Sequence, residues 1–435
     1  MRPSRRLLAI ASAFLAATAL TVSALAAPLL PVALLWGALL SFMLADLAIS
    51  PSRRAIAVEV TAPDEVFTGE DAIIRASIRS QGQPIPTSLS AILELSGDLG
   101  TRQDFTLRGS SRAVLGEARV PARRRGTFAL PGLWLSWPSR LGLWEFTPHF
   151  SLDTVLRVIP NIRPVVSGQI DVRVQSDLYG VKENALVGEG SEFHQMRDFM
   201  PGMDTRGIDW KRSARRRDLV VKEMQSERNH QIIVALDNGY LMREELAGLP
   251  KIDHAVNAAL ATAWAAGIGG DLVGLYSFDA VPRLFVPPQP GRAAFPALRA
   301  HTADLSYQTA SSNPTLALAH LNGKLNRRSL IIIFSDFADT TTAELLVENL
   351  TVLNRAHVII FATFSDPELE WRVGTAAHSL NGMAEAVAAT EMVKERRLVL
   401  DGLSRIGVIC LETNPGELTA RLVSTYLEIK AQELI

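Results

Sequence analysis

Two aspartates stand at the ends of apolar segments in the second half of the chain. Asp237 follows the run 231–236, and Asp336 follows the run 330–334 after one intervening serine. Continuous apolar runs of this length are typical of strands buried on both faces of a parallel sheet. Ligands of such sheets bind at the carboxyl ends of the strands, so both carboxylates are candidates for binding or catalysis. Alternatively, each caps a helix or accepts hydrogen bonds from loop amides.

The elements that position these aspartates alternate between strand and helix from residue 231 onward. Helical spacing of apolar residues predicts helices over 252–266, 316–325, 341–355, 384–405 and 415–434. Apolar β-rich runs predict strands over 231–236, 271–278, 330–334, 358–364 and 408–411. This alternation predicts an α/β, doubly wound sheet with helices on both faces, occupying residues 231–435.

The N-terminal segment is apolar enough to enter a membrane. Between residues 7 and 49 the only charged side chain is Asp46, and this length is about twice the ~20 residues that cross a bilayer as a helix. Pro28 and Pro31 favour a turn in the middle. We therefore expect a transmembrane helical hairpin over 7–27 and 29–49, within a domain that spans residues 1–54.

Arginines flank both ends of this segment, at positions 2, 5, 6, 53 and 54. The positive-inside rule then places both ends, and the soluble domains, on the cytoplasmic side of the inner membrane, with the lipid bilayer as a partner. The alternative is a cleaved signal peptide ending near residues 24–26, followed by a stop-transfer helix. That alternative leaves the remaining domains on the same side.

Residues 55–165 alternate apolar and polar side chains with period two, and glycine and proline interrupt the runs. This pattern predicts a small, immunoglobulin-like β-sandwich. Three consecutive arginines, 123–125, either form a solvated turn or meet anionic lipid of the nearby membrane.

Charges of both signs alternate with large apolar side chains over residues 190–215, within a segment spanning 166–230. A folded element that buries apolar groups and arranges ion pairs has this mixture, whereas a disordered tail lacks it. The residues of interest are Glu192, Phe193, Arg197, Asp204, Arg206, Asp209, Trp210 and Arg215. We expect Phe193, Ile208 and Trp210 to point inward, and Arg206 to pair with Asp204 or Asp209, and Arg197 with Glu192. The segment is either an internal brace or a partner-docking surface.

This segment resembles the signature of the domain-of-unknown-function family 58. The match comprises Gly-x-Glu-Phe from residue 190, and Arg206-x-Ile-Asp-Trp through Ala214-Arg215, with Met203 standing where the family usually has aspartate. The resemblance implies a von Willebrand factor type A-like domain after the signature. It also implies a bacterial membrane-anchored protein whose partner is a MoxR-type AAA+ ATPase.

The resemblance further implies a degenerate Mg²⁺ site. Type A domains often bind this ion through an Asp-x-Ser-x-Ser loop, a threonine and a second aspartate, because oxygen ligands suit it. Asp237 and Asp336 match the aspartates, and the threonine position falls near Ser312 or Thr315. Gly239 and Leu241 replace the two serines. We therefore expect no cofactor, and Mg²⁺ binding that is weak or missing.

Several function classes lack their motifs. The chain has no phosphate-binding Gly-x-x-x-x-Gly-Lys loop, no His-Glu-x-x-His and no Gly-x-Ser-x-Gly. Its formal net charge of -1 gives no overall attraction to nucleic acid, and its single cysteine allows no disulfide within the chain. We expect a protein-interaction module, an adaptor or assembly factor, rather than an enzyme. The alternative is a metal-dependent hydrolase using Asp237 and Asp336.

Overall fold

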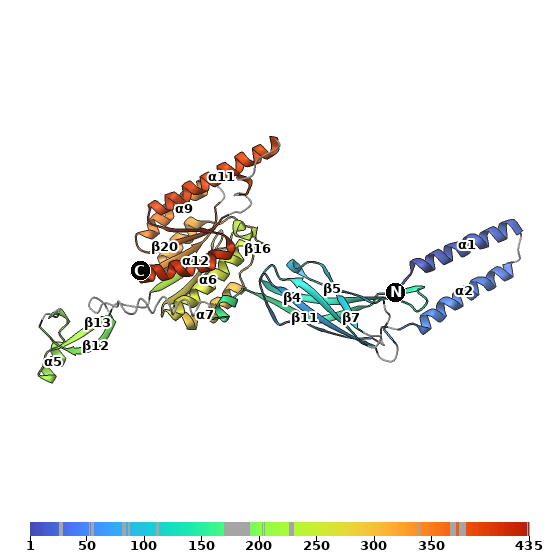
Figure 1. Ribbon diagram of the computed structural model, residues 1–435, viewed down its shortest axis with the longest axis horizontal. Helices are drawn as coiled ribbons and strands as arrows, with labels where there is room; N and C mark the ends of the chain where they lie inside the picture. The colour runs from blue at the N-terminus through green and yellow to red at the C-terminus, as the bar shows by residue number, and fades with distance from the viewer. Residues whose placement is uncertain are drawn as a thin grey trace. The chain divides into compact units, whose positions relative to one another are not determined.

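The chain forms two compact units, residues 1–159 and 160–435, in the computed structural model (Figure 1). The structure describes residues 1–25, 29–51, 53, 56–80, 84–85, 88–109, 113–168, 192–201, 203, 205–225, 230–337, 340–365, 371–373, 380–432 and 434. The first unit ends at residue 159, whereas the sequence predicted a domain boundary at 165. The difference arises because the short helix α3 (Arg163–Val166) groups with the second unit.

The first unit begins with two helices of similar length, α1 (Arg5–Leu25) and α2 (Leu29–Ile49). Within the described residues, α2 contains a window, Val32–Ile49, that is long and apolar enough to cross a membrane by length and composition. Pro31 lies in the first turn of α2, where its missing amide hydrogen is not needed by the helix.

Two β-sheets follow the helices. One has the order β1-β10-β9-β11-β3, with β5 also on β9 and β6 on β5; the other has the order β2-β4-β8-β7. Their bounds are β1 (Arg2–Pro3), β2 (Ile56–Thr61), β3 (Glu65–Phe67), β4 (Asp71–Ser80), β5 (Ser90–Glu94), β6 (Arg102–Asp104), β7 (Thr106–Gly109), β8 (Ala113–Pro121), β9 (Gly126–Pro138), β10 (Trp144–Phe146) and β11 (His149–Ile159).

The two sheets share one hydrophobic core. Ile74 and Ile78 of β4 and Leu130 and Leu133 of β9 belong to it, and Trp137 is also fully buried there. The expected alternation of inward apolar and outward polar residues is visible in the burial of β4, where every second residue from Ala72 is buried. Strand β1 is not predicted by its sequence, since two residues carry no periodicity; it forms by pairing with β10.

The second unit contains a six-stranded sheet of order β18-β17-β14-β19-β20-β21, in which only the β17–β18 pair is antiparallel. The strands are β14 (Gln231–Asp237), β17 (Leu272–Phe278), β18 (Pro282–Pro290), β19 (Leu330–Phe334), β20 (Val358–Phe364) and β21 (Ile409–Thr413). Its helices are α6 (Lys251–Ile268), α7 (Gly291–Ala303), α8 (Pro314–Lys324), α9 (Thr340–Asn354), α11 (Leu380–Arg405) and α12 (Pro415–Ala431).

Helices cover both faces of this sheet. Alternate strand residues such as Ile233 and Ile331 pack with Leu318 of α8, Leu350 of α9 and Leu403 of α11 in one core cluster. Helices α6, α7 and α12 pack together and contact strands β14, β17 and β21 (Figure 1). The alternation of strands and helices expected beyond residue 231 is present.

Strand β18 was not expected, because four of its nine residues are proline. Proline cannot donate to a strand ladder and is tolerated at a sheet edge, which is where β18 lies. Helix α7 was also not expected; Pro296 stands inside it.

Smaller elements also occur in the described part of the chain. They are the 3-10 turns η2 (Gly97–Leu99), η3 (Thr205–Gly207) and η4 (Tyr240–Arg243), the paired strands β15 (Glu245–Leu246) and β16 (Leu249–Pro250), and the elements of the signature segment, β12 (Glu192–Asp198), α5 (Trp210–Arg216) and β13 (Val220–Gln225).

Candidate functional site

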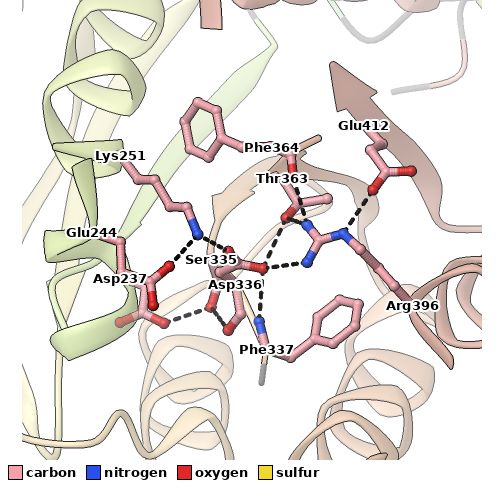
Figure 2. Close-up of polar contacts among 10 residues, drawn as sticks. All are labelled: Asp237, Glu244, Lys251, Ser335, Asp336, Phe337, Thr363, Phe364, Arg396 and Glu412. Carbon is pink, nitrogen blue, oxygen red and sulfur yellow. Dashed lines mark hydrogen bonds and ion pairs between the residues drawn. The ribbon is translucent and has the colours of Figure 1, made fainter. Parts of the chain in front are cut away.

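A row of polar side chains lies where the parallel strands of the second unit end. Asp237 is the last residue of β14, and Ser335 and Asp336 follow its neighbour β19. Thr363 of β20 and Glu412 of β21 extend the row (Figure 2). The two aspartates singled out by the sequence are therefore brought to adjacent strand ends.

Asp237 is almost completely buried, with 3% of its surface exposed. Its Oδ1 accepts hydrogen bonds from the Gly239 amide at 2.9 Å and from the Ser312 hydroxyl, and its Oδ2 accepts one from the Ser335 hydroxyl. Burial raises the pKa of Asp237, because these neutral donors compensate only part of the lost hydration. Of the two hydroxyls considered for this position, Ser312 meets Asp237, whereas Thr315 accepts a hydrogen bond from Asn349.

Gly239 owes its identity to this arrangement. A Cβ at position 239 would lie 2.0 Å from the Ser312 Oγ, far inside contact distance. The Ser312 hydroxyl therefore occupies the space that a side chain at 239 would need.

Asp336 holds two cations, one on each carboxylate oxygen. Lys251 Nζ lies 2.7 Å from its Oδ2, and the Arg396 guanidinium lies 2.8 Å from its Oδ1 (Figure 2). The Phe337 amide donates a further hydrogen bond to Oδ1 at 3.0 Å. The side chain of Asp336 is 5% exposed, so this is a buried three-member ion cluster.

Outer carboxylates and a ring complete the cluster. Lys251 also contacts Glu244 at 2.6 Å, and Arg396 contacts Glu412 at 2.7 Å. Arg396 donates to the Thr363 hydroxyl at 2.6 Å, and its guanidinium lies over the Phe337 ring, 5.0 Å from the centroid.

The charges of this cluster stabilise one another. Burial by itself raises the pKa of Asp336 and lowers those of Lys251 and Arg396, but the attraction between the groups outweighs burial in all three. The pKa of Asp336 consequently lies below its usual range, and the pKa values of Lys251 and Arg396 lie above theirs. All three stay charged at neutral pH, and the cluster fastens α6 and α11 to the sheet edge.

These residues do not fit a Mg²⁺ site. Mg²⁺ needs oxygen ligands in near-octahedral geometry. Here both oxygens of Asp336 face cations, and a divalent ion would add a third positive centre beside Lys251 and Arg396. Within the described part of the chain, no group of three His, Cys, Asp or Glu side chains has a metal-binding arrangement.

The sequence did not reveal Lys251 or Arg396 as members of the site. They are separated from Asp336 by 85 and 60 residues, respectively, and lie on helices of different faces of the sheet. Lys251 is the first residue of α6 and Arg396 lies inside α11, and neither position stands out in a helical pattern. The pair Ser335–Asp336 was the one local signal.

The signature segment forms an antiparallel pair of strands, β12 and β13, joined through α5. Asp209 caps α5 by accepting a hydrogen bond from the Arg212 amide at 3.0 Å, and it lies 3.4 Å from Lys222 Nζ. The cap hydrogen bond from the Arg212 amide is the main cause of a lowered pKa of Asp209; burial opposes it, and Lys222 lowers the pKa further. Ile208 is 9% exposed, as its expected inward position requires.

The expectation that Trp210 points inward is wrong, because its side chain is 68% exposed. It is the first residue of α5, and the residues buried here are instead Ile208, Ser213, Val220 and Val221. Trp210 was expected to be buried because it is large and apolar, but a helix of seven residues has only one buried side. The side chains of Glu192 and Phe193, and residue Asp204, fall outside the described part, so their pairings stay predictions.

Basic residues follow the exposed Trp210 along α5 and in the turn after it. They are all exposed, and comprise Lys211, Arg212, Arg215, Arg216 and Arg217. Arg216 lies 3.6 Å from Asp198 of β12. Arg206, one turn earlier in the chain, is exposed as well. The segment therefore presents one large aromatic ring among positive charges.

Comparison with known proteins gives a family of unknown function. The family model described as "Protein of unknown function DUF58" matches residues 195–377, which is less than half of the chain. Uncharacterized protein YeaD of Bacillus subtilis (strain 168) is 33% identical over 122 residues, covering 28% of this chain and 29% of that protein. Uncharacterized protein Rv1480 of Mycobacterium tuberculosis (strain ATCC 25618 / H37Rv) is 28% identical over 162 residues, covering 37% of this chain and 51% of that protein. The chain thus spans about half or less of these curated relatives.

Solved structures resemble the chain only distantly. The conserved hypothetical protein BatB from Bacteroides thetaiotaomicron gives a TM-score of 0.31 at 12% identity, covering 47% of this chain and 100% of that one. An aerotolerance-related membrane protein from Bacteroides fragilis NCTC 9343 gives 0.29 at 10% identity, with coverage of 47% and 100%. These likenesses carry no inference about activity. The family match over residues 195–377 begins within the signature of residues 190–215 and extends through most of the six-stranded sheet, and it supports the resemblance noted there.

Proposed function

We propose that this chain is a membrane-anchored protein-interaction module that faces the cytoplasm and serves a MoxR-type AAA+ ATPase as an adaptor or assembly factor. The observation that carries the proposal is the 68% exposed Trp210 among the exposed basic residues of α5. Tryptophan and arginine are the residues most enriched at interface hot spots. An indole ring that is exposed in the free chain offers a large apolar surface that a partner can bury.

The charges of the segment favour an acidic partner surface. Lys211, Arg212 and Arg215 bear positive charge on the same short helix as Trp210, and complementary charges speed association and select the partner. A partner with a hydrophobic pocket rimmed by Asp and Glu would match Trp210 and these residues. We place the ATPase in this role because the resemblance of residues 190–215 implies it.

The site at the strand ends supports binding rather than hydrolysis. A metal-dependent hydrolase would need Asp237 and Asp336 free to hold a metal, yet three hydrogen bonds surround Asp237 and two cations hold Asp336. We infer a von Willebrand factor type A-like domain without a metal, and the six-stranded sheet with helices on both faces supports it.

The membrane anchor is proposed from α1 and α2. Helix α2 meets the length and hydropathy of a membrane-spanning helix, and α1 precedes it with a similar length. Arginines at both ends of the pair favour the cytoplasm for both termini.

The proposal is tested by binding of the full chain, purified in detergent, to a purified MoxR-type ATPase from the same organism. Trp210→Ala is expected to weaken binding about 30-fold or more, the effect of a hot-spot residue. Trp371→Ala is the matched control, because Trp371 is equally exposed at 68% and lies in the same unit. Its affinity should equal that of the wild type.

Two results would contradict the proposal. One is an absence of binding by the wild-type chain, with nucleotide present or absent. The other is equal binding by wild type and Trp210→Ala. Because Trp210 is exposed, its replacement should leave the fold intact, and unchanged circular dichroism of the variant would confirm that lost binding reflects lost contact.

A further inference from the structure

Asp46, the only charged residue of helix α2, binds the end of this helix to the loop between β9 and β10. Asp46 is fully buried, and its carboxylate accepts hydrogen bonds from the Ser139 hydroxyl at 2.5 Å and the Leu141 amide at 2.9 Å. One turn later, the Ser50 hydroxyl accepts a hydrogen bond from the Arg140 amide at 3.0 Å. The loop between β9 and β10 therefore wraps the last turns of α2.

The start of the chain is attached to the same loop. The Ser4 amide donates to the Leu143 carbonyl at 2.9 Å, and the Ser4 hydroxyl donates to the Gly142 carbonyl at 2.6 Å. Leu7 is buried, and its amide donates to the Ser4 hydroxyl at 3.1 Å, which caps α1. The first turn of α1 and the last turns of α2 thus meet at one loop, residues 139–144.

This junction has the composition of a membrane interface. The Trp144 indole donates to the Met43 carbonyl of α2 at 3.1 Å, and Leu141 beside it is 49% exposed. Tryptophan is enriched where apolar spans meet the headgroup layer. Since the loop contacts α2 between residues 43 and 50, it lies at the end of the apolar window that runs from Val32 to Ile49.

Exposed arginines lie around this junction. Arg5 and Arg6 lie in the first turn of α1, and Arg140 lies in the loop itself. Arg6 approaches the loop closely, because a Cβ on Gly142 would be 3.3 Å from its guanidinium. By contrast, Arg2 is already held by Glu145 through two hydrogen bonds of 2.9 and 3.0 Å.

The arginines 123–125, considered from sequence as a lipid contact, are arranged differently. Arg125 is buried and Arg124 lies 3.3 Å from Asp98, which leaves Arg123 as the exposed member of the three. The 123–125 turn thus offers one exposed arginine, whereas the junction with α1 and α2 offers Arg5, Arg6 and Arg140.

We propose that Arg5, Arg6 and Arg140 form a binding site for the headgroup of an anionic phospholipid. The site rests on the proposed membrane anchoring. The apolar helices supply the surface for acyl chains, and the arginines supply bidentate donors for the phosphate. Asp46 fixes the loop that carries Arg140 at the end of α2, and the same loop contacts Ser4 at the start of α1. Its consequence is that the β-sheets are held at a set position against the bilayer surface.

The test measures lipid binding to the full chain in detergent by native mass spectrometry, with phosphatidylglycerol and phosphatidylcholine offered in equal amounts. The wild type is expected to prefer phosphatidylglycerol. The triple variant Arg5→Gln, Arg6→Gln, Arg140→Gln should bind it about tenfold or more weakly and bind phosphatidylcholine unchanged. Lysine at the three positions should restore most of the preference, because it keeps the charge.

A matched control replaces three exposed arginines elsewhere in the same unit, Arg79, Arg108 and Arg119, with glutamine. This variant has the same net charge as the triple variant and should keep the preference. Equal phosphatidylglycerol binding by wild type and triple variant, or equal loss in the control, would overturn the site. Extraction of the chain from liposomes by alkaline carbonate would instead overturn the anchoring, and with it the site.

Discussion

Replacing Asp336 by asparagine should destabilise the second unit strongly, although it changes almost no volume. The variant removes the charge that Lys251 and Arg396 share, at 2.7 and 2.8 Å, and turns one oxygen into a donor facing a cation. The side chains of Lys251 and Arg396 are only 10% and 20% exposed, so water replaces little of the loss. Breaking a buried ion cluster in this way costs about 3–5 kcal/mol.

The assay is hydrogen exchange of the β19 and β20 amides, measured by mass spectrometry on the full chain in detergent. If these amides exchange through opening of the unit, their rates should rise roughly 150- to 5,000-fold in Asp336→Asn. The remaining partners, Glu244 and Glu412, lie nearer the surface and should retain only part of the stability. Exchange rates within threefold of the wild type would refute the reasoning.

The pH dependence gives an independent check. The pKa of Asp336 is lowered in the folded chain, so its contribution is complete above the unfolded value of about 4 and is lost as pH falls through the folded pKa. The difference in free energy of unfolding between the wild type and Asp336→Asn should therefore shrink only at acidic pH. A difference that is constant down to the lowest pH at which the unit stays folded would contradict the charge argument.

Asp237→Asn is the matched control, since it makes the same chemical change on the neighbouring strand. The pKa of Asp237 is raised by burial, so its ionisation costs stability as pH rises above the unfolded value. Asp237→Asn should lower the free energy of unfolding less than Asp336→Asn does. Between pH 4 and pH 7 the wild type loses stability as Asp237 ionises, so the stability of Asp237→Asn relative to the wild type should rise. Equal costs at both positions would show that hydrogen-bond geometry, not charge, decides them.

Gly239→Ser should destabilise the second unit by about 1–3 kcal/mol through its clash with Ser312, and adding Ser312→Gly should recover part of this loss in thermal denaturation; no recovery would place the strain elsewhere. Calorimetry of the full chain is expected to show no saturable Mg²⁺ binding at millimolar concentration, and binding at tens of micromolar would disprove the assignment of the cations to Asp336. A reporter active only in the periplasm, fused after Ile435, should be silent, and a strong signal would reverse the topology. Asp46→Ala should increase protease cleavage in the loop 139–144 by freeing two hydrogen-bond donors, whereas unchanged cleavage would mean that the loop is held by other contacts.

The sequence by itself determined the elements whose patterns are strong and local. The buried strands of the second unit are continuous apolar runs, and the helices between them show helical spacing, so both were predictable. The two aspartates were also predictable as strand-end residues, because the carboxyl ends of parallel strands meet at one edge. The inward position of Ile208 was predicted as well, whereas Asp209 was expected to pair with Arg206 and its role as the cap of α5 was not predicted.

Tertiary structure alone decided which partners these residues have. Lys251 and Arg396 reach Asp336 across 85 and 60 residues, and nothing local marks a lysine at a helix start as the counter-ion of a distant carboxylate. The exposure of Trp210 depends in the same way on which side of a short helix meets β13. Periodicity records burial averaged over a segment, whereas an ion pair or an exposed ring depends on where separate segments pack in three dimensions.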